Sequence, residues 1–156
     1  MKLFAAMFFI LVFPLGALAE SCPAAPAAIE KAIRQHIATL RATEYCGART
    51  VKAKGNITVA IYTVEGACAA LNPRAKPGTC SNNWVRYIVA LSGQRVTPPV
   101  EVGGKGGLTD TGVKISEGVV EVSGLSLGPS DPMCCPSVPQ TKMFKISSSG
   151  LSEVRP

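Results

Sequence analysis

The chain has 156 residues, with 16 basic and 10 acidic side chains, a single histidine and a single tryptophan. This length suits one domain and is too short for two comfortable ones. The basic residues are scattered and are not interleaved with aromatic side chains, which argues against a nucleic-acid-binding surface. We interpret even the densest group, Arg49, Lys52 and Lys54, as a solvated basic surface that suits anionic partners.

The first nineteen residues predict a secretory signal peptide. A positive start at Lys2 precedes an almost wholly apolar run to Leu15, and residues 17–19 form a small-x-small cleavage site. That run is short for a membrane span, and Glu20 fits the bacterial lipidation pattern badly. We expect residues 1–19 to be removed and residues 20–156 to form one periplasmic or secreted domain, without stable membrane insertion. Loss of Lys2 leaves 15 basic against 10 acidic residues, a net charge of +5.

An amphipathic helix is predicted between Pro26 and Arg41. Its apolar residues recur at helical spacing, and they are Ile29, Ile33, Ile37 and Leu40. Alternating segments after the helix are predicted as strands, at residues 57–64, 84–91, 113–115, 119–127, 142–147 and 151–154. Pro98-Pro99 and the glycine-rich residues 103–107 interrupt this series. The pattern predicts an α+β domain, in which one N-terminal amphipathic helix packs on an antiparallel β-meander of about five to seven strands, stabilised by disulfides.

All six cysteines follow the cleavage site, and small exported domains commonly depend on disulfides. Cys68 and Cys80 bracket an insertion between two strands that we expect to pair. A Cys68–Cys80 bond is therefore predicted, and closing a loop of this size contributes about 3 kcal/mol.

The other four cysteines are harder to connect. A helix over residues 26–41 is about 24 Å long, and the arms that lead to Cys22 and Cys46 span about 30 Å only when fully extended. We therefore expect Cys22 and Cys46 to bond Cys134 and Cys135, in an order that the sequence does not fix. A Cys22–Cys46 bond accompanied by a Cys134–Cys135 bond is the alternative.

The adjacent pair Cys134-Cys135 is the one chemically unusual feature. A bond between neighbours closes a small strained ring, and strained disulfides are the labile ones, which suits a redox pair. We favour a structural clamp, because nothing adjacent is placed to lower a thiol pKa and the flanking prolines stiffen the loop. Zinc binding is not predicted, because no two cysteines have the two-residue spacing typical of structural zinc sites.

The sequence predicts no catalytic, cofactor-binding or metal-binding constellation, and we expect a protein that is not an enzyme. His36 lies at the border of the apolar stripe of the helix, with no nucleophile nearby in the sequence, so we assign it a structural or surface role. Asp110 and Asp131 are the only aspartates, and no acidic pair has a spacing that suggests a glycosidase. The glycines of residues 103–107 lack the Walker spacing and indicate a turn.

Several segments carry a resemblance. Residues 62–66, Asn82-Asn83-Trp84, residues 102–105 and the run Asp131-Pro132-Met133-Cys134-Cys135-Pro136-Ser137 resemble segments of a group of small, uncharacterised secreted bacterial proteins. The shared spacing extends from about Ile57 to the C-terminus. The resemblance implies a bacterial, exported, single-domain protein. Some members carry an Asp-rich run before the first strand, but this chain has few hard-cation ligands at residues 52–56, so calcium binding is not implied.

We expect the protein to act by binding, through a site formed by six residues in two loops: Asn82, Asn83, Trp84, Asp131, Met133 and Ser137. The prolines of residues 128–139 restrict the second loop, which therefore loses little entropy when it docks. The alternative for Trp84 is that it fills the core.

The sequence is compatible with three functions. The first is a binding or structural module of the cell envelope, whose partner is an envelope protein or an anionic cell-wall polymer. The second is an inhibitor or immunity protein against a cell-wall-acting enzyme. The third is a thiol-redox protein that uses Cys134-Cys135.

Overall fold

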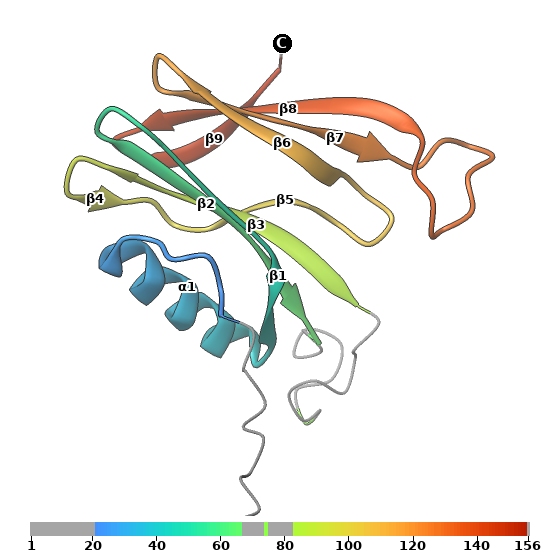
Figure 1. Ribbon diagram of the computed structural model, residues 1–156, viewed down its shortest axis with the longest axis horizontal. Helices are drawn as coiled ribbons and strands as arrows, with labels where there is room; N and C mark the ends of the chain where they lie inside the picture. The colour runs from blue at the N-terminus through green and yellow to red at the C-terminus, as the bar shows by residue number, and fades with distance from the viewer. Residues whose placement is uncertain (1–20, 67–73, 75–82, 156) are drawn as a thin grey trace, which may run out of the picture.

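The computed structural model describes residues 21–66, 74 and 83–155. The predicted signal peptide, the predicted Cys68–Cys80 bond and Asn82 lie outside the described residues. In the described part, one helix and nine strands form three layers (Figure 1). The elements are α1 (Ala27–Leu40), β1 (Thr43–Lys54), β2 (Ile57–Glu65), β3 (Trp84–Ser92), β4 (Arg95–Val96), β5 (Val100–Gly104), β6 (Thr109–Ser116), β7 (Val119–Ser126), β8 (Val138–Ser147) and β9 (Gly150–Val154).

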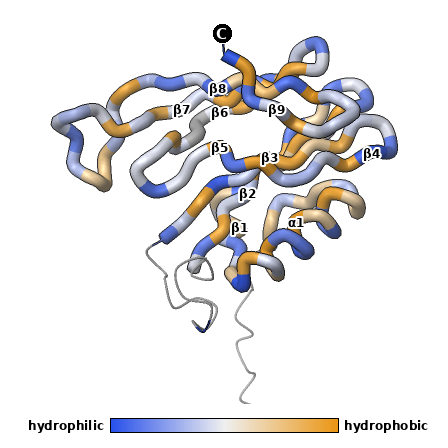
Figure 2. The backbone as a smooth tube through the Cα atoms, turned by 180° about the vertical axis from the view of Figure 1, so that it is seen from behind, coloured by the Kyte–Doolittle hydropathy of each residue, from blue (hydrophilic) through white to orange (hydrophobic). Residues whose placement is uncertain are grey.

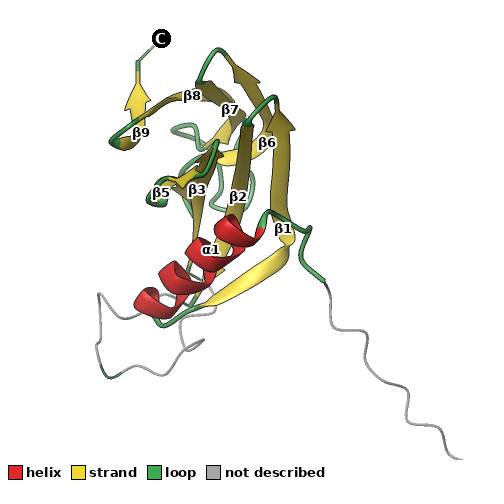
Figure 3. Ribbon diagram, turned by 90° about the vertical axis from the view of Figure 1, so that its left-hand side faces the viewer, coloured by secondary structure: helices red, strands yellow, loops and turns green. Residues whose placement is uncertain are grey.

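The middle layer is an antiparallel sheet with the order β1-β2-β3-β4, in which β5 also pairs with β3. A tight turn at Gly55, with a φ of +59°, joins β1 to β2 so that Lys54 pairs with Ile57. Strands β2 and β3 pair over their whole length, from Ile57 opposite Ser92 to Glu65 opposite Trp84. Helix α1 covers one face of this sheet (Figure 3).

The outer layer is the four-stranded antiparallel meander β6-β7-β8-β9, which covers the other face of the middle sheet. The predicted break at residues 103–107 is where the chain passes from one sheet to the other. A Cβ on Gly103 would collide with the Leu108 carbonyl oxygen, and one on Gly104 would lie 2.7 Å from the Trp84 carbonyl oxygen. Glycine is required there because the backbone segments approach so closely.

Two cores follow from the two faces of the middle sheet. Along β2, Val59 and Ile61 point toward the outer sheet, whereas Ala60, Tyr62 and Val64 point toward α1. The inter-sheet core adds residues such as Ile88, Val102, Val120, Val122 and Phe144, and the core under the helix adds Ile29, Ile33 and Val89. Hydrophobic residues accordingly recur along α1, β2 and β3 in Figure 2. A sheet buried on both faces explains why β2 is almost continuously apolar.

The prediction of an α+β domain, in which a helix packs on antiparallel strands, is confirmed. The helix matches the predicted periodicity and lies within the predicted residues 26–41, although at residues 27–40 it is not N-terminal in the chain as a whole. The prediction of one meander of five to seven strands is wrong, since the described residues form nine strands in two sheets. The longest strand that the sequence did not predict is β1, whose residues are mostly polar or small and lie at the sheet edge. The described part of the chain contains no helix with the length and apolar character needed to cross a membrane.

The expected bonds from Cys22 and Cys46 to the cysteine pair are wrong. Cys22 bonds Cys46, with 4.4 Å between their Cα atoms, and Cys134 bonds Cys135. The helix has 14 residues and is therefore about 21 Å long. The arms of five and six residue steps from its ends to the cysteines reach about 36 Å together at about 3.3 Å per step. Because β1 begins at Thr43 and runs extended beside α1, the two arms are long enough to bring Cys22 and Cys46 together.

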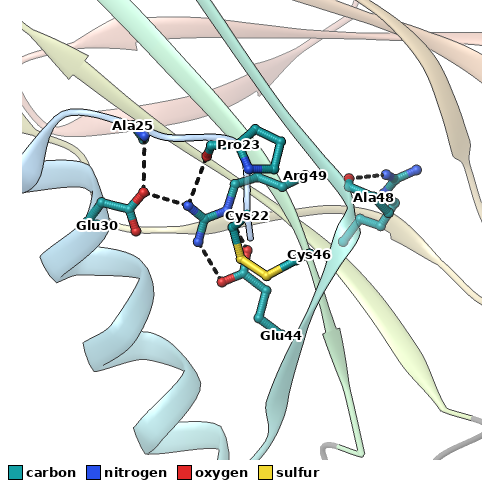
Figure 4. Close-up of polar contacts among 9 residues, drawn as sticks. Cys22, Pro23, Ala25, Glu30, Glu44, Cys46, Ala48 and Arg49 are labelled. Atoms are coloured by element: carbon teal, nitrogen blue, oxygen red, sulfur yellow. Dashed lines mark hydrogen bonds and ion pairs between the residues drawn. A yellow bond between two sulfur atoms is a disulfide. The ribbon is translucent and has the colours of Figure 1, made fainter. Parts of the chain in front are cut away.

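Next to this disulfide, the buried Arg49 joins three segments of the chain (Figure 4). Its Nε and Nη2 donate to the two carboxylate oxygens of Glu44, each at 2.6 Å. Its Nη1 donates to Glu30 Oε1 of α1 at 2.5 Å and to the Pro23 carbonyl at 3.2 Å. The ladder with β2 shifts register between Tyr45 and Thr50, and this irregularity brings Arg49 back to Glu44 on the same strand. The interpretation of Arg49 as part of a solvated surface is therefore wrong.

We expect Arg49→Met to lower the free energy of unfolding by about 3 kcal/mol, because it leaves two partly buried carboxylates without their cation. The measurement is denaturant unfolding at neutral pH. Arg34→Met removes an exposed arginine of α1 and is the matched control, expected within about 0.5 kcal/mol of the parent. Equal effects of the two variants would contradict this account of Arg49.

Candidate functional site

The face of the middle sheet that is turned toward the outer sheet, here called its inner face, changes from apolar to polar toward one end. Along β3, the buried Ile88 is followed on the same face by Arg86 and then Trp84, because side chains alternate along a strand. On β2, Ile61 is followed by Thr63, which pairs with Arg86. Arg86 donates from Nη2 to the Ala48 carbonyl of β1 at 2.7 Å. The apolar core therefore ends before these strands do.

The facing side of the outer sheet changes in the same direction. Along β8, the buried Phe144 shares its face with Lys142 and Gln140, and along β7 Val122 shares its face with Ser126. Phe144 pairs with Val120, whereas Gln140 pairs with Gly124 farther along. Both sheets thus present polar side chains at the end where residues 105–108 connect them.

A cleft of 410 Å³ opens between the sheets at this polar end. Its lining comes from β3, β5, β7, β8 and the connection between the sheets: Asn83, Trp84, Val85, Glu101, Gly103, Gly104, Lys105, Gly106, Gly107, Leu108, Ser126, Gln140 and Lys142. The lining combines one aromatic ring with amide, hydroxyl and charged groups. Such a mixture of one apolar surface and a few polar groups suits a polar organic ligand.

The loop of residues 128–137 projects beside this cleft at the end of the outer sheet (Figure 1). Asp131 Oδ2 accepts hydrogen bonds from the backbone N–H groups of Gly128 and Ser137, each at 2.8 Å. The Ser137 hydroxyl donates to the same carboxylate at 2.9 Å. These bonds, first that from Gly128 and then those from Ser137, lower the pKa of Asp131. The carboxylate therefore ties together the two ends of the loop.

The predicted site residues have different positions. Asn83 and Trp84 line the cleft, and Trp84 is half-buried at the start of β3. Met133 is 62% exposed, and its Cε lies 3.6 Å from the place that a Cβ on Gly106 would occupy. The loop therefore touches the glycine turn that closes the cleft, and Lys105 of that turn donates its N–H to the Trp84 carbonyl at 3.0 Å. The structure brings Asn83, Trp84 and Met133 together around one turn.

Asp131 and Ser137 are also in this loop, but their side chains bond each other and the loop backbone. They hold the loop in shape. The residues that sequence reasoning missed are Lys142, Gln140, Ser126 and Lys105 of the cleft. The signal was present in β8, where every second residue changes from polar to apolar in the order Gln140, Lys142, Phe144, Ile146. This change predicts that a strand leaves the core partway along its length.

His36 lies beneath the middle sheet, on α1. Its Nδ1 is 2.7 Å from the hydroxyl of the fully buried Tyr62, and its ring meets Tyr87 edge-on at 4.5 Å between centroids. Burial raises the pKa of Tyr62, so this phenol keeps its proton, and the tautomer of the imidazole sets which of the two groups donates the hydrogen bond. Burial also lowers the pKa of His36. The contacts of His36 therefore join α1 to β2 and β3.

No group of three or more His, Cys, Asp or Glu side chains among the described residues is arranged to hold a metal ion. Comparisons with protein-family models, with curated proteins and with solved structures found no match to the chain.

We call the hydrogen bonds of the Asp131 carboxylate to Gly128 and Ser137 the Asp131 brace. A carbon-detected NMR titration tests this brace. We expect the Asp131 carboxyl to titrate below its usual value of 3.8, because its anion is hydrogen-bonded. The brace is then complete above that pH and is lost as the pH falls through the lowered pKa. Ser137→Ala should move the pKa of Asp131 upward without restoring the usual value, because the larger contribution from Gly128 remains. A normal pKa of Asp131 in the parent would contradict the brace.

The stability of the protein should depend on pH through His36. In the folded protein the pKa of His36 lies below its usual value of 6.5. At a pH between the folded and the usual pKa, the unfolded chain therefore binds more protons than the folded one. The free energy of unfolding is therefore expected to be highest above 6.5 and to decrease as the pH falls from about 7.5 to about 5.5. His36 is the only histidine, and His36→Asn, which keeps an acceptor for Tyr62, should flatten the curve in this range. The same slope in parent and variant would exclude His36 as its origin.

Proposed function

We propose that this protein is a non-catalytic binding module of the bacterial cell envelope that holds an anionic cell-wall polymer in the inter-sheet cleft. The observation that carries the proposal is the convergence of Trp84, Gln140 and Lys142 from two sheets on one cleft. The envelope location rests on the signal peptide expected at residues 1–19.

The chemistry of the cleft fits a sugar chain with acidic groups. An indole ring packs well against the C–H face of a sugar ring, since it offers a large apolar surface with a polar edge. The amides of Asn83 and Gln140 donate to and accept from sugar hydroxyl groups, and the hydroxyl of Ser126, which donates to the Val138 carbonyl at 3.4 Å, accepts from them. A lining that combines these groups distinguishes this cleft from the wholly apolar pockets of lipid carriers.

The charges of the cleft favour an anion. Lys105 and Lys142 outnumber Glu101, the one acidic residue of the lining. The counter-charge of Lys142 is Glu153, whose carboxylate is 4.0 Å from Nζ and whose side chain is 52% exposed. An ion pair of that length at a solvated site is weak, so the ammonium of Lys142 remains available for a carboxylate or phosphate group of a ligand.

The loop of residues 128–137 supplies a second contact surface at the rim of the cleft. Its backbone is restricted by prolines, by the Asp131 brace and by the Cys134–Cys135 bond. A segment so restricted loses little conformational entropy on binding. The exposed Met133 at its tip also favours a second candidate function, an inhibitor or immunity protein that inserts this loop into the cleft of a cell-wall-acting enzyme.

The fluorescence of Trp84 tests the first function directly, because it is the only tryptophan in the chain. We expect the emission to change and to saturate with an anionic cell-wall polymer but not with a neutral glucan. Lys142→Gln should weaken this binding about tenfold, equivalent to about 1.4 kcal/mol. Lys145→Gln is the matched control on the outward face of β8, where the side chain is exposed, and should leave affinity unchanged.

Equal affinities of the two lysine variants would refute the cleft as the binding site. The second function makes a different prediction. If the protein inhibits a cell-wall hydrolase, Met133→Ala should abolish inhibition in an assay of that enzyme, whereas Lys142→Gln should keep it.

A further inference from the structure

The Cys134–Cys135 bond is unlike the other described disulfide in what it constrains. Cys22 and Cys46 are separated by 24 positions, whereas Cys134 and Cys135 are neighbours. The stabilisation of a fold by a disulfide comes mainly from the loop that it closes in the unfolded chain, and it increases with the length of that loop. A bond between neighbours closes almost no loop. It therefore joins no separate segments of this fold.

The loop also keeps its shape through bonds that do not involve sulfur. Asp131 ties Gly128 to Ser137, as described above, and the N–H of Cys135 donates to the Pro132 carbonyl at 3.0 Å within the loop. The ends of the segment are thus held on either side of the two cysteines. Breaking the sulfur bond would leave this closure intact.

Both cysteines of the pair are accessible from solvent. Cys134 and Cys135 are exposed, as are the preceding Pro132 and Met133. Cys22 and Cys46 are only partly exposed, and they lie beside the ion pairs of Arg49, where the N-terminal segment meets β1 (Figure 4). An attacking thiolate must reach a sulfur atom along the axis of the disulfide, so access decides which bond reacts.

We propose that Cys134–Cys135 is a thiol–disulfide exchange site, which accepts two electrons from an external thiol or dithiol while the fold remains intact. The thiolate of the reductant attacks one of the two Sγ atoms, the bond between them breaks, and the other sulfur leaves as a thiolate that takes a proton from water. A second thiol of the reductant attacks the mixed disulfide and releases the oxidised reductant. The pair thereby gains two electrons and two protons, and two reductant thiols become one disulfide.

The exchange has a consequence for the rim of the cleft. Met133, which lies against the Gly106 turn, is the neighbour of Cys134. Reduction frees the backbone between Pro132 and Pro136 while Asp131 still holds the ends of the loop. The oxidation state of the pair then sets how rigidly Met133 is presented. This proposal goes beyond the binding function and does not depend on it, because its readout is the sulfur chemistry itself.

The test is differential alkylation of the oxidised, folded protein during incubation with dithiothreitol, followed by peptide mass mapping. We expect alkylation of Cys134 and Cys135 at least about tenfold faster than that of Cys22 and Cys46, because the first pair is exposed whereas the second pair is only partly exposed. Circular dichroism should show no loss of structure at the time when the first pair is fully reduced. Equal rates for both pairs, or reduction of Cys134 and Cys135 only as the protein unfolds, would overturn the proposal.

A pair of double variants separates exchange from stabilisation. Cys134→Ser/Cys135→Ser should leave the midpoint of denaturant unfolding close to that of the parent, whereas Cys22→Ser/Cys46→Ser should lower it clearly. If removal of the neighbouring pair lowers the midpoint as much as removal of Cys22–Cys46, the pair is a structural staple and the proposal is wrong.

Discussion

The position of helix α1 on the middle sheet depends on one buried cation. Arg49 is 7% exposed, and its guanidinium binds a carboxylate of its own strand, a carboxylate of α1 and a carbonyl of the N-terminal segment. The hydrogen bonds with Glu44 raise the pKa of Arg49 further, so the guanidinium is charged at neutral pH. A planar guanidinium can satisfy three such partners at once, which an ammonium group cannot do with the same geometry. The adjacent Cys22–Cys46 bond joins two of these segments covalently, the N-terminal segment and β1.

The position of the helix has consequences on both faces of the middle sheet. With α1 held over one face, Tyr62 and Val64 are buried on that side, and β2 and β3 must bury their other face as well. The outer sheet covers it only where both partners are apolar, and Phe144 marks the limit of that contact on β8. Beyond Phe144 the inner faces carry polar side chains, so water is not excluded and the sheets enclose a cleft. The site is therefore a result of where the inter-sheet core ends.

Much of the fold could be predicted from local patterns, because those patterns report which face of an element is buried. The spacing of Ile29 and Ile33 gave the helix within one residue at each end, and β2 and β3 were found from their β-branched residues. Strand β1 was missed because it lies at the edge and carries Arg49 and Glu44, whose partners become visible only in three dimensions. The cysteine connectivity was missed because it depends on how far two extended arms reach beside the helix.

The candidate site was predicted only in part, for a related reason. Trp84 and Met133 were identified from an unusual local sequence, whereas Lys142 and Gln140 belong to a strand that is apolar in its second half and gave no motif. The physical signal is a mismatch between the position of these residues in the fold and their polarity. Inward-facing positions of a two-sheet core normally carry apolar residues, whereas here they carry an amide and an ammonium group. An apolar side chain in place of the partly buried Lys142 would extend the core, and full burial of such a side chain stabilises a protein by about 1.5–3 kcal/mol. Polar residues at positions that favour a longer core are expected where a protein gives up stability for a binding surface.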